Sequence, residues 1–276
     1  MNPYNPFSLT HFAATIADVC AVERPKQAQP PLDWAVALLK AYCKDGFDRV
    51  LLHNADAVGM WLCKAYPQLL EPVRKHTLLT IPFQAVMPSV TPVCFGSMYT
   101  GANPEIHGIQ KYEKPVIQID TLFDAFIRAG KRVAIVSTQT ASMSNIFLQR
   151  PVDIYNCPSE GAIVEKAQEL ILQDTYDLLC VYTYMYDTMD HRHGPQAPES
   201  IAALANQGQI FDSLVSTIER NWTGHNTLIG FAPDHGVHST PEDSNLLGNH
   251  GTDSPLDLNI LHYFGVVCGK NIGSKF

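Results

Sequence analysis

The sequence predicts an α/β protein, a three-layer sandwich in which helices cover both faces of a mainly parallel central sheet. Segments with helical periodicity alternate with short, nearly continuous apolar runs along most of the chain. Such runs are typical of parallel strands, which are buried on both faces. The repeated order of helix, glycine and strand therefore favours a sheet that is covered on both sides.

The helix and strand units follow residues 1–31, which are rich in proline and polar residues and which we expect to form an irregular arm. Four units of a helix followed by a strand then cover residues 33–56, 121–138, 162–184 and about 198–236. The first helix ends at a glycine, and the last runs from about Pro198 to Asn221. Because no internal repeat or linker interrupts the chain, we expect residues 1–276 to form a single domain.

Composition narrows the range of partners and locations. The chain has 276 residues, of which 46% are hydrophobic and 17% are charged, so it can bury a large core. The net charge of -8 argues against a nucleic-acid polymer as a partner, and no apolar run is long enough to suggest a membrane partner. Seven scattered cysteines and an N-terminus without a signal-peptide pattern favour a cytoplasmic protein. The oligomeric state is not indicated.

Three of the predicted strands end in an aspartate, namely Asp56, Asp187 and Asp234. Ligands of such sheets bind beyond the carboxyl ends of the strands, so these side chains are candidates for a site. Each aspartate taken alone is equally compatible with capping the next helix. Histidines accompany them, however: His191 is one helical turn after Asp187, and His235 directly follows Asp234. Carboxylates and imidazoles without cysteine favour zinc or manganese.

A further candidate lies in residues 86–109, VMPSVTPVCFGSMYTGANPEIHGI. Thr91 precedes Pro92, a residue favoured at the first position of a helix. Thr91 is therefore interpreted as a helix N-cap, as a nucleophile beside the positive end of the helix dipole, or as both. Cys94 is the alternative nucleophile in this segment, and we interpret it as a core residue.

Taken together, these motifs resemble the alkaline phosphatase superfamily, most closely its type I phosphodiesterase/nucleotide pyrophosphatase branch. That branch has a strand-end Asp, a Thr followed by T-G-x-x-P-x-x-H-G-I, then D-x-x-x-H-x-x-G-P, D-H-G and H-G. In the same order, the chain has Asp56, Thr91 with TGANPEIHGI, DTMDHRHGP, DHG and the HG of His250. The resemblance covers residues 56–251, nearly all of the predicted domain.

The resemblance implies an alkaline-phosphatase-like fold and two divalent metal ions, expected to be Zn²⁺, with Mn²⁺ as the alternative. It implies Asp187, His191 and His250 as ligands of the first ion. It implies Asp56, Asp234 and His235 as ligands of the second, completed by the hydroxyl of Thr91. It also implies that Thr91 is the nucleophile, which forms a covalent phosphothreonine intermediate.

The chain departs from the family pattern at two positions. Ala57 stands where the family has the glycine of a D-G pair, and Tyr112 stands where H-G-I-x-x-N has its asparagine. We therefore expect Lys111, Tyr112 and Lys114 to bind the phosphoryl group, although two solvated lysines and a packed tyrosine would also fit. No inserted stretch is long enough for a full cap domain, so we expect little or no cap.

These observations predict a metal-dependent hydrolase of small phosphorylated substrates, with phosphodiesters or nucleotide pyrophosphates favoured. The alternatives are a phosphomonoesterase, a phosphonate hydrolase or a phosphomutase of the same superfamily. A sulfatase is disfavoured because the chain has no C-x-P-x-R motif. A non-catalytic binding protein with this fold is a further alternative, but every expected ligand position holds a residue able to bind metal.

Overall fold

The computed structural model describes residues 3–241 and 244–269. Its main sheet has eight strands in the order β1-β3-β10-β7-β2-β6-β4-β5. They are β1 (Phe7–Ser8), β2 (Arg49–Ala55), β3 (Leu79–Gln84), β4 (Val133–Ser137), β5 (Asp153–Asn156), β6 (Leu178–Thr183), β7 (Thr227–Phe231) and β10 (Asn259–Val267). β10 is antiparallel to both of its neighbours, and the other pairs are parallel. A separate two-stranded sheet pairs β8 (His238–Ser239) with β9 (Gly248–Asn249).

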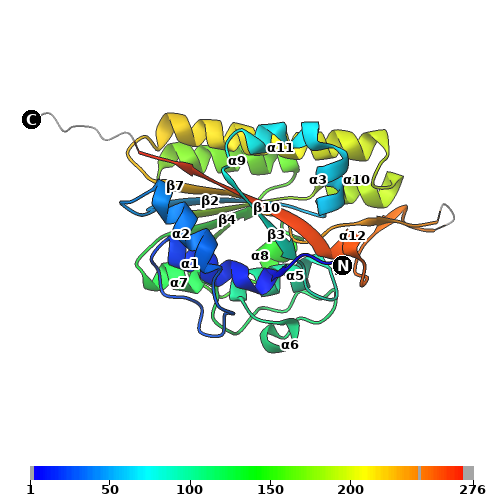
Figure 1. Ribbon diagram of the computed structural model, residues 1–276, viewed down its shortest axis with the longest axis horizontal. Helices are drawn as coiled ribbons and strands as arrows, with labels where there is room; N and C mark the ends of the chain where they lie inside the picture. The colour runs from blue at the N-terminus through cyan, green and yellow to red at the C-terminus, as the bar shows by residue number, and fades with distance from the viewer. Residues whose placement is uncertain (1–2, 242–243, 270–276) are drawn as a thin grey trace, which may run out of the picture.

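Helices lie on both faces of the main sheet (Figure 1). One face carries α3 (Met60–Ala65), α4 (Glu71–Arg74), α9 (Glu160–Gln173), α10 (Met185–His193) and α11 (Pro198–Asn221). The other carries α1 (Phe12–Val19), α2 (Asp33–Tyr42), α5 (Thr91–Thr100), α7 (Leu122–Arg128) and α8 (Ser142–Asn145). The shorter helices are η1 (Leu9–His11), η2 (Pro67–Leu70), α6 (Pro104–His107) and α12 (Pro255–Leu258). This arrangement confirms the predicted three-layer sandwich with a mainly parallel sheet.

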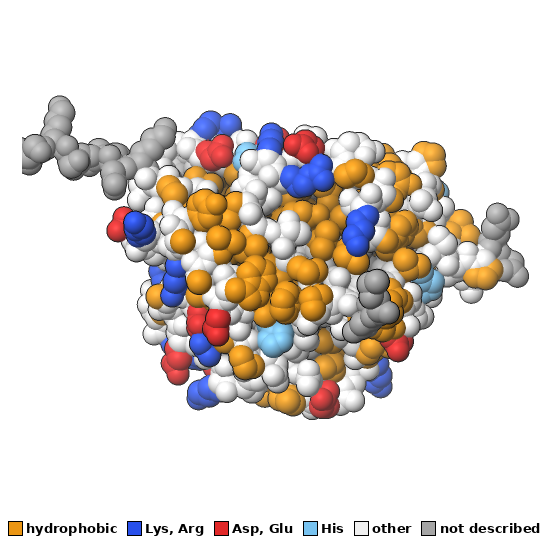
Figure 2. All heavy atoms as spheres, in the orientation of Figure 1, with side chains coloured by type: hydrophobic (Ala, Val, Ile, Leu, Met, Phe, Trp, Pro, Cys, Tyr) orange, Lys and Arg blue, Asp and Glu red, His pale blue; other side chains and the backbone are white. Residues whose placement is uncertain are grey.

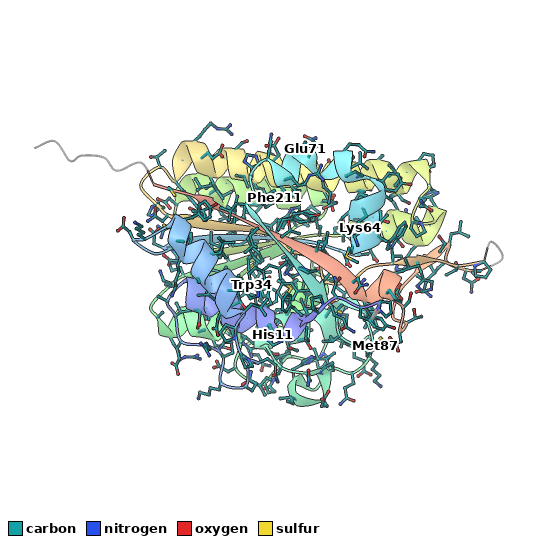
Figure 3. All side chains as sticks on the ribbon, viewed as in Figure 1. His11, Trp34, Lys64, Glu71, Met87 and Phe211 are labelled. Carbon is teal, nitrogen blue, oxygen red and sulfur yellow. The ribbon has the colours of Figure 1, made fainter. Side chains whose placement is uncertain are left out.

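Each face of the sheet has its own apolar core, as the predicted burial of the strands requires. All residues of β4, β6 and β7 are buried, which explains their continuous apolar runs. Figure 3 shows Phe211 of α11 on one side of the sheet and Trp34 of α2 on the other. Figure 2 shows apolar side chains on the face toward the viewer, and α2 has Trp34, Leu38 and Tyr42 exposed.

The prediction of an irregular arm over residues 1–31 is wrong for residues 7–19, where the chain forms β1, η1 and α1. Phe12, Ala13 and Ile16 of α1 are fully buried, so the helix belongs to the core. The side chain of Asn5 donates to the carbonyls of Phe83 and Ile260, which ties the segment to β3 and β10. Residues 1–2 of the predicted arm lie outside the described residues.

The parallel strands bring the candidate site residues to one edge of the sheet. Ala55 of β2 pairs with Thr183 of β6, and His53 pairs with Phe231 of β7, so these three strands end together. β3 runs in the same direction as β7, because both are antiparallel to β10 between them. The segment after β3 therefore leads to α5 and Thr91 at the same edge. Among the described residues, no helix is both long and apolar enough to cross a membrane.

Candidate active site

Six side chains form two compact groups at this edge of the sheet. In each group, one potential ligand atom per residue lies within 4.8 Å of the others. The inner group consists of Asp56, Asp234 and His235, and the outer group consists of Asp187, His191 and His250. The structure thus brings together the two sets of side chains that the sequence motifs suggested.

The inner group is attached to the ends of two central strands. Asp56 directly follows β2, and Asp234 and His235 follow β7 after a short turn. The Nε2 atom of His235 lies 3.5 Å from an oxygen of Asp56 and 3.4 Å from an oxygen of Asp234. The opposite nitrogen, Nδ1, lies 3.0 Å from the Gly236 carbonyl and can donate to it. That bond leaves the lone pair of Nε2 facing both carboxylates, as a metal ligand requires.

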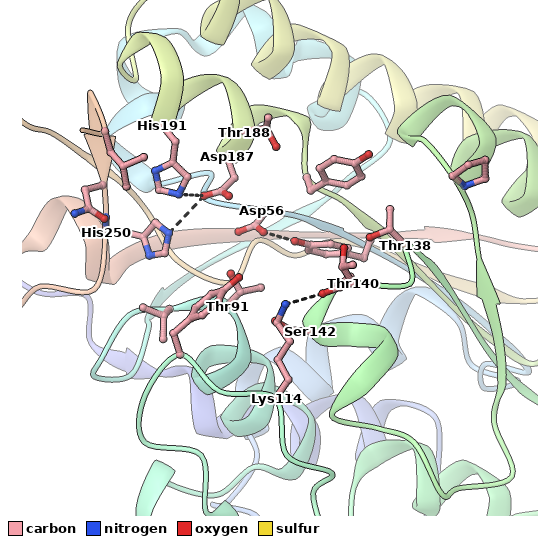
Figure 4. Close-up of a pocket in the computed structure, with 18 residues that line it drawn as sticks. Asp56, Thr91, Lys114, Thr138, Thr140, Ser142, Asp187, Thr188, His191 and His250 are labelled. Carbon is pink, nitrogen blue, oxygen red and sulfur yellow. Dashed lines mark hydrogen bonds and ion pairs between the residues drawn. The ribbon is translucent and has the colours of Figure 1, made fainter. Parts of the chain in front are cut away.

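The outer group repeats this arrangement on α10 and the segment after β9. Asp187 and His191 are one turn apart on α10, and both His191 Nε2 and His250 Nε2 face the same Asp187 oxygen, at 3.4 and 3.5 Å (Figure 4). His191 Nδ1 lies 2.8 Å from the Gly248 carbonyl, and His250 Nδ1 lies 3.0 Å from the Ser89 carbonyl. Both imidazoles therefore present their Nε2 lone pairs to the carboxylate.

The charges of the site favour a bound cation. Asp56, Asp187 and Asp234 each have one buried oxygen without a hydrogen-bond partner among the described residues. Burial, followed by repulsion from Asp234 and Asp187, raises the pKa of Asp56. Burial, with repulsion from Asp187, raises the pKa of Asp234 to about 7. Burial also acts on Asp187, but His250 and His191 outweigh it and lower its pKa. Divalent cations bound to these oxygen and nitrogen atoms would stabilise the three carboxylates in their charged form.

Thr91 lies where the inner and outer groups meet. Its hydroxyl oxygen is 3.3 Å from His235 Nε2, and the rings of His235 and His250 stack with their centroids 4.1 Å apart. The interpretation of Thr91 as an N-cap is wrong: Thr91 is the first residue of α5, and Val90 occupies the cap position. The Thr91 hydroxyl therefore faces the site and is not needed to cap the helix.

Cys94, the alternative nucleophile, lies in the core and is fully buried. Burial raises the pKa of its thiol well above the usual value, so the thiolate is disfavoured. The core interpretation of Cys94 is confirmed.

A pocket of about 650 Å³ opens over Thr91 and the outer group (Figure 4). Two of the three predicted phosphoryl contacts, Tyr112 and Lys114, line it. The Lys114 ammonium donates to the Thr140 carbonyl at 2.6 Å. Lys111 is not among the lining residues, and its ammonium pairs with Glu113 at 2.8 Å on the surface. The structure therefore does not support a role for Lys111 in this pocket.

Sequence reasoning missed several hydroxyl groups of the pocket. Thr138, Thr140 and Ser142 follow β4, and Tyr182 and Tyr184 lie at the end of β6. Tyr182 donates a hydrogen bond to Asp56. The rule that identified the strand-end aspartates would also have found these residues, because β4 and β6 end at the same edge.

Ala57 adopts a left-handed backbone conformation with φ of 61°. This turn directs the Ala57 N–H to Asp234 Oδ1, 3.3 Å away. Glycine adopts such a conformation without steric cost, whereas alanine does so with strain. Ala57, which stands in place of the family's glycine, thus keeps the ligand position of Asp56 at some cost in backbone energy.

Comparisons with known proteins agree with this geometry. Residues 136–261 match the model of the family described as type I phosphodiesterase / nucleotide pyrophosphatase. The resemblance to the alkaline phosphatase superfamily is confirmed. Two curated relatives are the catalytic subunits of human and mouse GPI ethanolamine phosphate transferase 3, which are 25% and 24% identical to this chain over 179 residues. The match covers 62% of this chain but only 15% of the length of those relatives.

Solved structures of two other proteins share the fold. One is an inactive threonine-to-alanine variant of murine ectonucleotide pyrophosphatase / phosphodiesterase 5 in complex with AMP, with a TM-score of 0.64 and 12% identity over 79% of this chain and 88% of that one. Another is the phosphonoacetate hydrolase of Sinorhizobium meliloti 1021 in complex with phosphonoacetate, with a TM-score of 0.54 and 15% identity over 72% of this chain and 59% of that one. The family-model match agrees with the predicted class, a phosphodiesterase-type hydrolase.

Proposed function

We propose that the protein hydrolyses phosphodiesters or nucleotide pyrophosphates with the help of two divalent metal ions, and that Thr91 is the nucleophile. The observation that carries this proposal is the position of the Thr91 hydroxyl. It lines the pocket, 3.3 Å from a nitrogen of the inner group and beside the outer group. The inactive threonine-to-alanine variant of the murine relative also supports an essential threonine in this fold.

The inner and outer groups would each hold one ion, with Thr91 as a further ligand of the inner one. The chemistry that divalent cations supply at such a pair of sites is a lower pKa for a nearby hydroxyl and compensation of phosphoryl charge. We propose Zn²⁺, with Mn²⁺ as the alternative, because the donors are imidazoles and carboxylates without a thiolate.

The residues of the chain then have distinct tasks. The Thr91 oxygen loses its proton to solvent and forms a bond to phosphorus as the bond from phosphorus to the leaving oxygen breaks. The leaving group, an alcohol from a diester or a phosphate from a pyrophosphate, takes up a proton where it needs one. Water then attacks the phosphorus of the phosphothreonine, and the bond from phosphorus to the Thr91 oxygen breaks. The phosphate product leaves, and the Thr91 oxygen takes up a proton, which restores its hydroxyl. Placement of Thr91 at the start of α5 favours both steps, because the positive end of the helix dipole stabilises the phosphoryl oxygens.

The charge of the pocket supports a diester over a monoester. Lys114 is the one Lys or Arg among the residues that line it, and its ammonium already donates to Thr140. The other lining donors are mainly neutral hydroxyls, which suit a phosphoryl group with a single negative charge. A phosphomonoesterase, a phosphonate hydrolase and a phosphomutase remain the alternatives within the superfamily.

The curated relatives favour a second candidate function. They are named as transferases, so an alcohol in place of water would be the acceptor in the second step. Release of product from a diester in water alone, with no increase when a simple alcohol is added, would exclude this candidate for the alcohol tested.

We also propose a cytoplasmic location, because all seven cysteines are free thiols. A single domain over residues 1–276, and a small phosphorylated substrate as the main partner, complete the proposal.

The experiment is a screen of four substrates on metal-free protein with each divalent metal added back. The substrates are bis-p-nitrophenyl phosphate, p-nitrophenyl phosphate, a nucleotide p-nitrophenyl ester and phosphonoacetate. We expect turnover of the first or third that requires metal. Turnover of p-nitrophenyl phosphate alone would instead indicate a phosphomonoesterase, and turnover of phosphonoacetate alone would indicate a phosphonate hydrolase. Absence of both turnover and metal binding would favour the non-catalytic binding protein.

A further inference from the structure

A buried carboxylate outside the pocket contacts the start of the helix that carries the outer group. Glu160 is the first residue of α9, and its side chain is only 5% exposed. One of its oxygens, Oε2, accepts hydrogen bonds from the backbone N–H groups of Tyr184 and Met185, at 2.8 and 2.9 Å. These groups lie at the junction between β6 and α10, two or three residues before Asp187.

This contact replaces an ordinary helix cap. Tyr184 occupies the N-cap position of α10, and its own side chain makes no capping hydrogen bond. The first N–H groups of a helix have no partner within the helix, and a negative charge beside them is favourable. The Glu160 carboxylate supplies both a partner and the charge. Asp187 lies in the first turn of α10 and His191 in the next, so both side chains belong to the helix whose start this contact caps.

Glu160 is itself held by a chain of buried polar groups. Its other oxygen, Oε1, accepts from the side-chain amide of Gln207 on α11 at 3.2 Å. Thr183 donates its hydroxyl to Gln207, and the Thr183 oxygen lies 2.8 Å from Nε2 of His53. His53 belongs to β2, the strand that directly precedes Asp56. The chain of contacts therefore connects the helix of the outer group to the strand that carries the inner group.

We propose that Glu160 is a positioning residue for the outer group: it fixes the start of α10 so that Asp187 and His191 are set to bind a divalent cation. The inference rests on the proposed function, because it assumes that the outer group binds metal. Its contacts are with the backbone of α10 and with Gln207 and Asn206, so Glu160 is not itself a ligand. Removal of the Glu160 side chain is thus expected to weaken the binding of one of the two ions and to leave the affinity for the other unchanged.

The test is a titration of metal-free protein with Mn²⁺ that counts the bound ions and measures each affinity. In Glu160→Ala, one ion is expected to bind about tenfold or more weakly, a loss typical of partners that orient metal ligands. Glu160→Gln keeps an amide oxygen as an acceptor and is expected to fall between Glu160→Ala and the wild type. Glu165→Ala is the matched control, because Glu165 is an exposed carboxylate on the same helix.

The weakened ion is assigned with a double variant. His191→Ala removes a ligand of the outer group, so the tighter remaining ion belongs to the inner group. Adding Glu160→Ala to this variant is expected to leave the affinity of that ion unchanged. A further loss of affinity would show that Glu160 does not act specifically on the outer group.

Two results would overturn the inference while the proposed function stands. The first is binding of two ions by Glu160→Ala and by Glu160→Gln with wild-type affinities. The second is an equal loss of both affinities that accompanies a lower unfolding temperature of the metal-free variants, as expected for a residue that only stabilises the fold. Failure of the wild-type protein to bind any divalent ion would overturn the proposed function as well. If Glu160→Ala does not fold, the comparison of Glu160→Gln with wild type and Glu165→Ala decides.

Discussion

The inner and outer groups use the same types of side chain, but different parts of the fold hold them. The inner group follows the central strands β2 and β7, and its side chains are 2% exposed or less. The outer group is carried by α10 and by the segment after β9, and its Asp187 and His191 side chains are 19% and 23% exposed. The sheet itself positions the inner group, whereas the outer group depends on peripheral elements and on their contacts.

This difference has a consequence for local stability. Peripheral elements open at lower free energy than the central strands of a sheet. His191 and His250 reach their positions through contacts with two other segments, at Gly248 and Ser89. Local opening of any of these segments separates the outer ligands while the inner group stays intact. We therefore expect the outer ion to exchange faster than the inner ion.

The largest expected effect concerns Thr91, which contacts the inner group. Thr91→Ala is expected to lower kcat by at least about 10³-fold, because it removes the proposed attacking oxygen. The unfolding temperature should change little, since Val90 and not Thr91 occupies the cap position. Steady-state kinetics and thermal unfolding measure both quantities, with Thr91→Ser as the control that keeps a hydroxyl. Near-normal activity of Thr91→Ala would mean that another group attacks phosphorus.

Removal of one ligand from each group tests the comparison directly. His191→Ala is expected to lower the affinity for one ion by at least about 100-fold. The fold should stay intact, because the outer group lies at the periphery. Asp234→Asn is expected to weaken the other ion and also to alter stability, since Asp234 is fully buried. Metal titration and thermal unfolding of both variants provide the measurement. Equal stability changes in the two variants would contradict the distinction between the groups.

The metal-free protein should have an unusual pH dependence. The pKa of Asp234 is about 7 in the folded protein, against 3.8 as the ordinary value, so the folded state binds more protons between these values. Its stability is then expected to fall as the pH rises from about 4 to about 7, by up to about 1.4 kcal/mol per pH unit for one group. Denaturant unfolding at several pH values, with and without metal, measures this. If the metal-free protein becomes more stable over this range, the carboxylates of the inner group do not dominate the pH dependence of its stability.

A smaller effect is expected on the substrate side of the pocket. Lys114→Ala is expected to lower kcat/KM for a diester by about tenfold, a barrier increase of about 1.4 kcal/mol. Lys111→Ala serves as the control, since Lys111 pairs with Glu113 away from the pocket. The two variants are assayed on a monoester and a diester. Equal effects of the two substitutions on kcat/KM would contradict a contact between Lys114 and the phosphoryl group of the substrate.

The smallest effect concerns the backbone beside the inner group. Ala57→Gly is expected to raise the free energy of unfolding by about 1 kcal/mol, because glycine adopts the left-handed conformation without strain. The unfolding temperature should rise by about 2–4 °C. Thermal unfolding of the metal-loaded protein tests this, and a lower unfolding temperature would show that the methyl group of Ala57 contributes more by packing than it costs in strain.

Much of this architecture was predictable because periodic burial leaves a pattern in the sequence. The helix over Pro198–Asn221 has the predicted bounds, since its buried face is mainly apolar. Helix α1 was missed because FAATIADV is buried nearly all round, so it lacks the alternation of polar and apolar faces. The proline-rich segments around it also resemble a loop.

The site was predictable to the extent that its residues follow strands or belong to motifs. The residues of both groups were predicted from the aspartates at the ends of strands and from the order of motifs in the family. Sequence spacing did not distinguish Lys111 from Lys114, because it does not determine the directions in which adjacent loop residues point. Glu160 gave no signal, since its partners are backbone N–H groups 24 and 25 residues away and any sequence can provide those.

The position of β10 within the sheet bears on the order in which the protein folds. Among the described strands, β3 and β1 join the others only through β10, which comprises residues 259–267. During synthesis, β2, β4, β5, β6 and β7 are complete before β10 exists, so they can pair first. β3 has no strand to pair with on its inner side until then, and Thr91 follows β3. We expect a nascent chain that stops before residue 259 to contain all six proposed ligand side chains while Thr91, the proposed nucleophile, is still unplaced. The complete candidate site would then form only in the last step of sheet formation.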